Sequence, residues 1–410
     1  MKFRRQAGAY VFRSYGVAGL RLLRNLLLMM TVPMEIFGQT QMALGILALV
    51  VSLCLPGIDS LLTQTFARKE PIEIERHLRL KLLASTFWAV ACIGYAAYAY
   101  YVEHQPGDFA LTLVLLALTL PLEGYSIVRA VWLGQGQIAL IAKRDLSAAF
   151  LALLATAVFA WQAPENILLL VVVPRLIEAV TWQLPYRKAV RPLSVDAGAE
   201  VYREQRGYAL HRSLLMFLPT LEIRLDRVIV GALYGFKDLA IFAVAKFVME
   251  QLKTFTVSIL AILMPRLAKG DDAAARHELR RLGLPIAAAI GICACVLCFC
   301  AIMAIDLVVP QYEGSKRYIL LYLSGALLSI PGALIQSFTE ARKKIRVEYA
   351  SRSLIAVIGL GAMAILVPLC GMDGVVYAFI LKAGAISVVN IIICWPHIDW
   401  RADAIAKQSD

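Results

Sequence analysis

The chain has 410 residues, of which 60% are hydrophobic and 17% charged, and its mean hydropathy is +0.71. A water-soluble domain cannot bury that much apolar surface, so the composition excludes one or several soluble domains. The net charge of +12 would suggest a nucleic-acid partner in a soluble protein, but in a membrane protein the location of the charge matters more than its size.

Windows of about 20 apolar residues, enough to cross a bilayer as a helix, recur from Tyr10 to Ile393. They predict an all-α polytopic membrane protein with about twelve transmembrane helices, which the longest polar interval, 187–212, divides six and six. The expected spans are 10–34, 41–65, 80–101, 108–131, 146–161, 166–184, 209–233, 238–264, 283–309, 317–338, 350–369 and 374–395. The expected domains are an N-terminal lobe (1–186), a cytoplasmic interlobe linker (187–208), a C-terminal lobe (209–400) and a cytoplasmic tail (401–410).

Basic residues concentrate in alternate connections between these spans. The connections 66–79, 132–145, 185–208, 265–282 and 339–349, together with both tails, hold most of the Lys and Arg. By the positive-inside rule these segments face the cytoplasm, so we expect a multi-pass plasma-membrane protein, of the bacterial inner-membrane type, with both termini cytoplasmic. The basic loops then need no nucleic-acid partner, and attraction to membrane lipids accounts for them.

The sequence carries no recognisable catalytic pattern. All eight cysteines lie within expected spans or at their ends, where they act as small hydrophobes, so we expect no disulfide, no metal site and no cofactor. The outward connections are too short for a catalytic domain, and no nucleotide-binding loop is present. We therefore expect a transporter rather than an enzyme, with a coupling ion that the sequence does not name.

Ionisable side chains deep inside spans are informative because each costs at least about 2.5–3.5 kcal/mol at a lipid-facing helix centre. Arg21 and Arg24 are i,i+3 neighbours on a first span that contains no acid. Arginine binds phosphate groups bidentately, so this pair favours a diphosphate ligand. Lys246, Glu250 and Lys253 fall at i, i+4 and i+7 and form one polar stripe, for which binding and structural roles stay open. The residues expected to line a cavity or to form structural ion pairs are Arg175, Glu178, Asp226, Arg227, Glu250 and Lys382.

Three short stretches suggest a family. They are Phe37-Gly38 followed by Pro56-Gly57-Ile58-Asp59, then Leu225-Asp226-Arg227 through Gly231 and Gly235, and finally Met264-Pro265-Arg266-Leu267-Ala268. With these stretches the chain resembles the multidrug, oligosaccharidyl-lipid and polysaccharide exporter (MOP) superfamily, and within it the O-antigen-type repeat-unit flippases. The resemblance implies two six-helix lobes around a central cavity, which is filled with water and has a cationic surface for the substrate phosphates. Carried onto this sequence, it implies that the substrate-binding residues are Arg21, Arg24, Arg224, Lys246 and Lys253.

The function that this resemblance implies is translocation of a polyprenyl-diphosphate-linked oligosaccharide to the outer leaflet by alternating access, for cell-surface polysaccharide (lipopolysaccharide O-antigen or exopolysaccharide) biosynthesis. The expected partners are that lipid-linked glycan, membrane lipids and other polysaccharide assembly proteins. One alternative is a cation-coupled multidrug exporter of the same superfamily, which would favour acids over arginines in the first span. Another is a membrane polysaccharide polymerase or ligase, which would need a large outward loop.

Overall fold

The computed structural model describes residues 2–195, 198–267, 272–341 and 345–394, and within these ranges the chain forms helices and no strand. It divides into two compact units, Met1–Leu239 and Ala240–Asp410. The expectation of an all-α polytopic protein is confirmed, because twelve expected spans correspond to twelve long helices or pairs of consecutive shorter ones. The expected tail, 401–410, lies outside the described residues.

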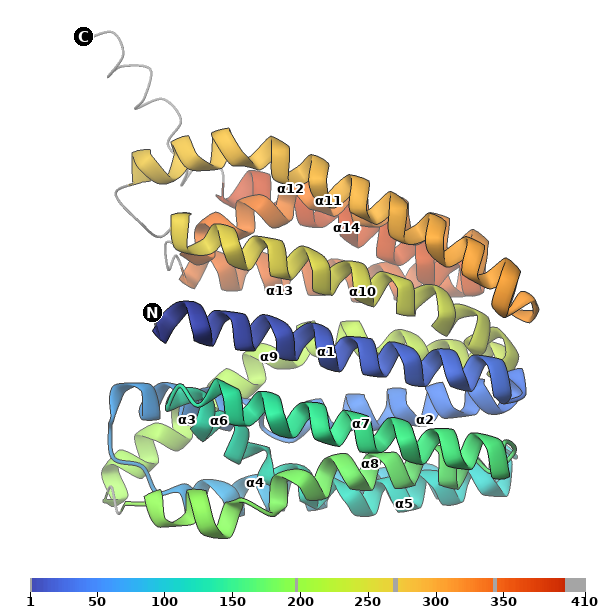
Figure 1. The fold of residues 1–410 in the computed structure, drawn as a ribbon, viewed down its shortest axis with the longest axis horizontal. Helices are drawn as coiled ribbons and strands as arrows, with labels where there is room; N and C mark the ends of the chain where they lie inside the picture. Colours follow the sequence, from blue (N-terminus) through green and yellow to red (C-terminus); the bar gives the residue numbers. More distant parts are fainter. Residues whose placement is uncertain (1, 196–197, 268–271, 342–344, 395–410) are drawn as a thin grey trace, which may run out of the picture. The chain divides into compact units, whose positions relative to one another are not determined.

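The first unit is built from long helices that run side by side (Figure 1). Its elements are α1 (Lys2–Thr31), α2 (Met34–Leu53), α3 (Pro56–Arg68), α4 (Ile74–Tyr101), α5 (Gly107–Glu123), η1 (Gly124–Ser126), α6 (Ile127–Gly134), α7 (Ile138–Gln162), α8 (Ile167–Gln183), η2 (Tyr186–Val190), η3 (Arg191–Leu193) and α9 (Ala199–Tyr234). Helix α7 packs on α1 and on α8, α5 packs on α4 and α8, and α9 packs on α2 and α3.

Two expected spans of this unit are interrupted near a proline. The span expected over 41–65 ends as α2 at Leu53 and restarts as α3 at Pro56, which occupies the first helical position. Proline has no backbone N–H and its ring blocks the preceding turn, so a continuous helix cannot form there. Leu55, just before the proline, adopts a left-handed backbone with φ of 55°. Similarly, the 108–131 span becomes α5, η1 and α6, with Pro121 in the last turns of α5.

Glycines allow α9 to approach α2 and α3 closely. A Cβ atom added at Gly57 would lie 2.0 Å from the carbonyl oxygen of Ala209 on α9, and one added at Gly38 would lie 1.9 Å from that of Phe236, just beyond the end of α9. The Gly57 N–H donates a hydrogen bond to Ser213 Oγ at 2.9 Å. Small residues that let backbones meet are the usual means of helix association in membranes, where apolar contacts with lipid compete with apolar contacts between helices.

The second unit repeats this kind of contact. After α10 (Phe236–Leu267) it contains α11 (Asp272–Val308), η4 (Pro310–Tyr312), α12 (Ser315–Ala341), α13 (Ile345–Cys370) and α14 (Met372–Cys394). Helix α12 packs on α14, and the Gly332 N–H donates to Ser387 Oγ at 3.1 Å. The Asn390 amide donates to the Gly332 carbonyl at 3.2 Å, which satisfies buried polar groups inside an apolar helix pair.

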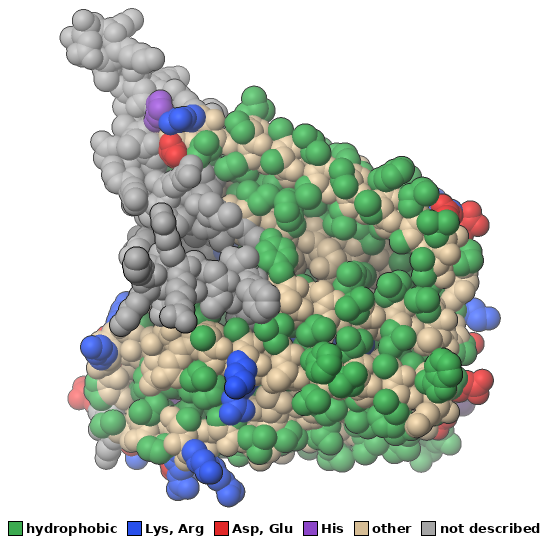
Figure 2. All heavy atoms as spheres, in the orientation of Figure 1, with side chains coloured by type: hydrophobic (Ala, Val, Ile, Leu, Met, Phe, Trp, Pro, Cys, Tyr) green, Lys and Arg blue, Asp and Glu red, His purple; other side chains and the backbone are tan. Residues whose placement is uncertain are grey.

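The surface is that of a membrane protein. In the described ranges, eight helical stretches are long and apolar enough to cross a bilayer. Large apolar side chains remain exposed along them, including Leu284 and Leu307 at 79% and 77%. Figure 2 shows hydrophobic side chains covering much of one face, with charged side chains mainly toward its margins. Such extensive apolar exposure fits a lipid environment.

The expected boundary between lobes is described only in part. The interval 187–208 contains most of η2, all of η3 and the first turns of α9, which begins at Ala199. By contacts, α9 belongs to the first compact unit. The division into six-helix lobes at 187–208 stays a prediction.

Candidate functional site

Arg24 of α1 lies in a partly buried network of charges inside the first unit. Its Nη1 atom is 3.4 Å from Glu178 Oε1 on α8, and each side chain is 18% exposed. The other Glu178 oxygen, Oε2, lies 3.5 Å from Arg175 Nη1. Arg175 also forms an ion pair, through Nη2, with Glu123 at the end of α5. We call Arg24, Glu123, Arg175 and Glu178 the α1–α5–α8 charge network.

The network changes the interpretation of the arginine pair on the first helix. Helix α1 supplies no acid to Arg24, but Glu178 supplies one from a helix far away in the sequence. Arg21 differs, because its side chain is exposed and makes no ion pair with any described residue. It lies close enough to Arg24 to repel that guanidinium electrostatically. With Arg21 included, three arginines face two glutamates, a local surplus of one positive charge.

A second buried charged residue, Lys81, was not among the expected site residues. Lys81 of α4 is 3% exposed and its Nζ donates to both carboxylate oxygens of Asp59 at 2.6 Å. Its third donor reaches Ser126 Oγ at 2.7 Å. Since all three ammonium hydrogens are used, the group is satisfied as a structural tie among α3, α4 and η1. The count of charges in mid-span did not include Lys81 because it lies at the start of the span expected over 80–101. The signal that could have found it is Asp59, an acid inside the span expected over 41–65, which needs a cation or water beside it.

The charges on α9 lie in the same unit. Arg224 is half-buried, and Glu222 and Asp226 are buried. Asp226 Oδ1 accepts a hydrogen bond from the Arg227 backbone N–H at 2.7 Å. Arg227 packs where α2 has Gly45, whose added Cβ would lie 3.2 Å from the Arg227 Cβ atom. Asp226 and Arg227 are thus held in the helix packing, and Arg224 is the cation of this group that keeps the most freedom to meet a ligand.

The remaining expected site residues lie in the second unit. On α10, Lys246 is buried while Lys253 is exposed, and Glu250 between them is half-buried. Lys382 is half-buried on α14. All four take part in interactions in the structure, so none is an isolated charge. Whether these cations and the arginines of the first unit serve one cavity stays a prediction.

Solved structures with a similar fold define the class. The chain aligns over 98% of its length with the whole of an inward-facing multidrug resistance MATE family transporter of the MOP superfamily, with a TM-score of 0.62 and 12% identity. It also aligns over 96% of both chains with a MOP superfamily transporter from Pyrococcus furiosus, described as having a binding pocket of reverse polarity that suggests a different function, at a TM-score of 0.60 and 13% identity. A MATE structure in the bent conformation gives a TM-score of 0.58 at 14% identity, over 99% of this chain and 97% of the other. The fold is that of the MOP-superfamily transporters.

Sequence comparison gives the family. Residues 32–316, more than half of the chain, match the family described as "Polysaccharide biosynthesis protein", and the chain belongs to that family. The search of curated proteins finds no match. The resemblance to the MOP superfamily that the sequence suggested is confirmed, and the protein is a multi-pass membrane transporter of that superfamily.

Proposed function

We propose that this transporter moves a polyprenyl-diphosphate-linked oligosaccharide from the cytoplasmic to the outer leaflet of the plasma membrane, for cell-surface polysaccharide assembly. Both termini face the cytoplasm in this proposal, as the distribution of Lys and Arg favours. Membership of a polysaccharide biosynthesis family supports the glycan as substrate. The substrate's sugar headgroup and diphosphate cross through the protein by alternating access while the polyprenyl tail stays in lipid.

The observation that carries the proposal is the position of Arg21 on α1. Arg21 is exposed and has no acidic partner among the described residues, and it lies beside Arg24. A guanidinium fork pairs bidentately with phosphate oxygens, and two forks one helical turn apart match the two phosphates of a diphosphate. An anion bound here neutralises the surplus positive charge of the arginines over Glu123 and Glu178.

The α1–α5–α8 charge network gives the site a way to bind and release. Glu178 divides its two oxygens between Arg24 and Arg175, at 3.4 and 3.5 Å, which are long contacts for ion pairs. A diphosphate can take the place of Glu178 as the partner of Arg24, and Glu178 can reclaim Arg24 when the diphosphate leaves. Competition of this kind lowers the net affinity, as a transporter that must release its substrate requires.

The test is flipping of a fluorescent polyprenyl-diphosphate sugar in proteoliposomes. Arg21→Ala should lower the transport rate at limiting substrate by about 10–100-fold, because a hydrogen-bonded contact to a charged group contributes roughly 1.5–3 kcal/mol. Arg21→Lys keeps the charge without the fork and should lie between alanine and wild type. The matched control is Arg203→Ala, an exposed arginine at the start of α9. Full flipping by Arg21→Ala, or an equal loss in Arg203→Ala, would refute the role of Arg21.

A second candidate function, cation-coupled multidrug export, is favoured by one observation. Glu123 and Glu178 are partly buried carboxylates, which are the groups that a cationic drug or a coupling ion needs. Efflux of a cationic dye from the same proteoliposomes distinguishes the two. Robust dye efflux that is lost in Glu123→Gln, with no movement of the lipid-linked sugar, would favour the multidrug function and overturn the flippase proposal.

A further inference from the structure

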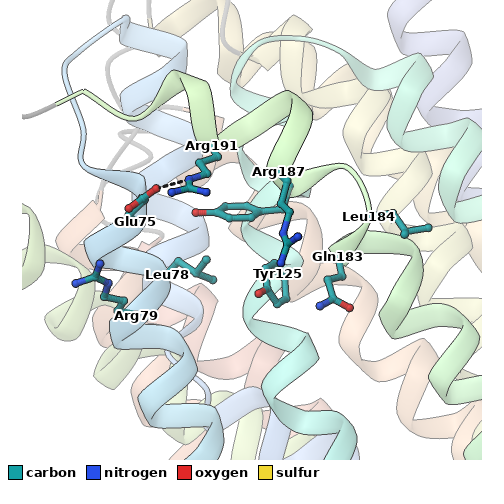
Figure 3. A pocket seen from close by; sticks show the side chains of 9 residues that line it. Glu75, Leu78, Arg79, Tyr125, Gln183, Leu184, Arg187 and Arg191 are labelled. Atoms are coloured by element: carbon teal, nitrogen blue, oxygen red, sulfur yellow. Dashed lines mark hydrogen bonds and ion pairs between the residues drawn. The ribbon is translucent and has the colours of Figure 1, made fainter.

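A cavity of about 530 Å³ opens in the first unit, apart from the α1–α5–α8 charge network. Its walls come from the first turns of α4, from η1, from the end of α8 and from the turns η2 and η3 (Figure 3). We call it the α4–α8 pocket. Helices α4 and α8 both belong to stretches of membrane-crossing length, and the pocket lies at their ends. It is therefore at the boundary of the bilayer, where lipid headgroups lie.

The pocket is cationic. Arg79, Arg187 and Arg191 line it together with one acid, Glu75, which leaves a surplus of two positive charges. Arg191 Nε donates to Glu75 Oε1 at 2.7 Å, so this pair is internally neutral. Neither Arg79 nor Arg187 forms an ion pair with a described residue, and both are exposed. Figure 3 shows Glu75 and Arg79 on α4, and Arg187 and Arg191 on the chain that follows α8.

The pocket is also fixed in shape and has an apolar lining. Tyr125 and Tyr186 meet edge to face with ring centroids 5.3 Å apart, and Leu78 is buried beside them. The chain beyond η3 is tied to the start of α4, because the Ile74 N–H donates to Ser194 Oγ at 3.0 Å. Leu184, across the pocket from Arg79 in Figure 3, is 69% exposed. A preformed, partly apolar cavity of this size suits a small ligand or a headgroup.

We propose that the α4–α8 pocket, which Arg79 and Arg187 line, binds a phosphate-bearing group supplied by an anionic phospholipid. Two arginines without acidic partners provide the forks for a phosphate, and the exposed Leu184 gives the start of an acyl chain an apolar surface. Basic pockets between membrane helices are typical sites for anionic headgroups. A free phosphate would share the charge contacts but would gain nothing from Leu184. This site is independent of the proposed transport substrate.

The experiment is native mass spectrometry of the full-length protein with added phosphatidylglycerol, phosphatidylcholine or inorganic phosphate. The key variant is Arg79→Gln/Arg187→Gln, and the matched control is Arg203→Gln/Arg206→Gln, which removes the same charge from exposed arginines of α9. We expect phosphatidylglycerol to bind wild type and the control at least 10-fold more tightly than the key variant. Phosphatidylcholine and inorganic phosphate should compete poorly.

Three results would overturn the proposal. Equal loss of phosphatidylglycerol in both double variants would show a general effect of surface charge. Equal retention in both would show that the pocket is not the site. Displacement of the lipid by inorganic phosphate at equal concentration would assign the pocket to a free anion. If the double variant does not fold, the single variants Arg79→Gln and Arg187→Gln apply the same test, each with a smaller expected loss, and unchanged binding in both would refute the site.

Discussion

The buried tie between Lys81 and Asp59 predicts an unequal response to removal of either partner. Lys81 is 3% exposed, whereas the Asp59 side chain is 35% exposed. Asp59→Asn leaves a buried ammonium without its counter-charge, which costs about 3–5 kcal/mol of the free energy of unfolding. Lys81→Met leaves a carboxylate that water can reach, so we expect a smaller cost of about 2 kcal/mol.

The double variant completes the cycle. Asp59→Asn/Lys81→Met removes both charges together, and its cost should fall short of the sum of the single costs by about 2 kcal/mol or more, because the partners contact each other directly. Unfolding by SDS titration in mixed micelles, followed by circular dichroism, measures each value. Lys188→Met, at an exposed lysine of η2, is the matched control and should change the stability by less than about 0.5 kcal/mol.

Two outcomes would refute this reasoning. Additive single costs would show that the ammonium and the carboxylate do not depend on each other. A larger cost for Lys81→Met than for Asp59→Asn would show that the carboxylate left without its partner is costlier than the buried ammonium left without its own, contrary to their exposures.

Three further predictions follow from the same structure. Glu178→Gln removes the acid that competes with the ligand for Arg24, so a polyprenyl diphosphate should bind about 5-fold more tightly in equilibrium binding. Weaker binding would make Glu178 a positioning residue. Gly57→Ala places a Cβ atom 2.0 Å from the Ala209 carbonyl oxygen and should lower the thermal unfolding midpoint by several degrees. The control, Gly94→Ala, has open space around it and should leave the midpoint unchanged or raise it. Asn166→Ala removes the side-chain acceptor that caps α8 and should cost about 1 kcal/mol in the same SDS titration, and a loss below about 0.3 kcal/mol would show that the cap is not formed.

The sequence predicts the helical architecture well because the bilayer imposes it locally. A run of apolar residues must form a helix in lipid, whatever it packs against, since its backbone has no other hydrogen-bond partners. The break before Pro56 could also have been predicted, because proline cannot continue a helix from the preceding turn. The contacts that join one helix to another cannot be predicted from local sequence. Glu178 lies 154 residues from Arg24, and the periodicity of neither helix predicts that the two side chains meet.

The candidate site shows the same limit in another form. Counting charges in mid-span identified Arg24, Arg175 and Glu178 as residues that need protein or water around them, and the structure places all three in one network. The count did not include Lys81, because a lysine near a helix end can reach the headgroup region with its long side chain. Whether such a lysine reaches the headgroups or forms a buried ion pair depends on whether a carboxylate such as Asp59 lies within reach. Only the fold determines that.

The close packing of α9 has a consequence for how the chain can be divided. Gly57 meets the backbone of α9 at Ala209, and Gly38 meets the backbone at Phe236, just beyond the end of α9. The nearest atom in each contact is a carbonyl oxygen of the backbone, which cannot change rotamer as a side chain can. Contacts therefore join α9 to helices far before it in the chain, although the most polar stretch of the sequence separates them. A protein cut within 187–198, ahead of α9, and expressed as two fragments would carry α9 on one fragment and its partners α2 and α3 on the other. Such fragments could reassemble only if Gly38 and Gly57 of the first fragment pack again on the carbonyl groups of Phe236 and Ala209 of the second.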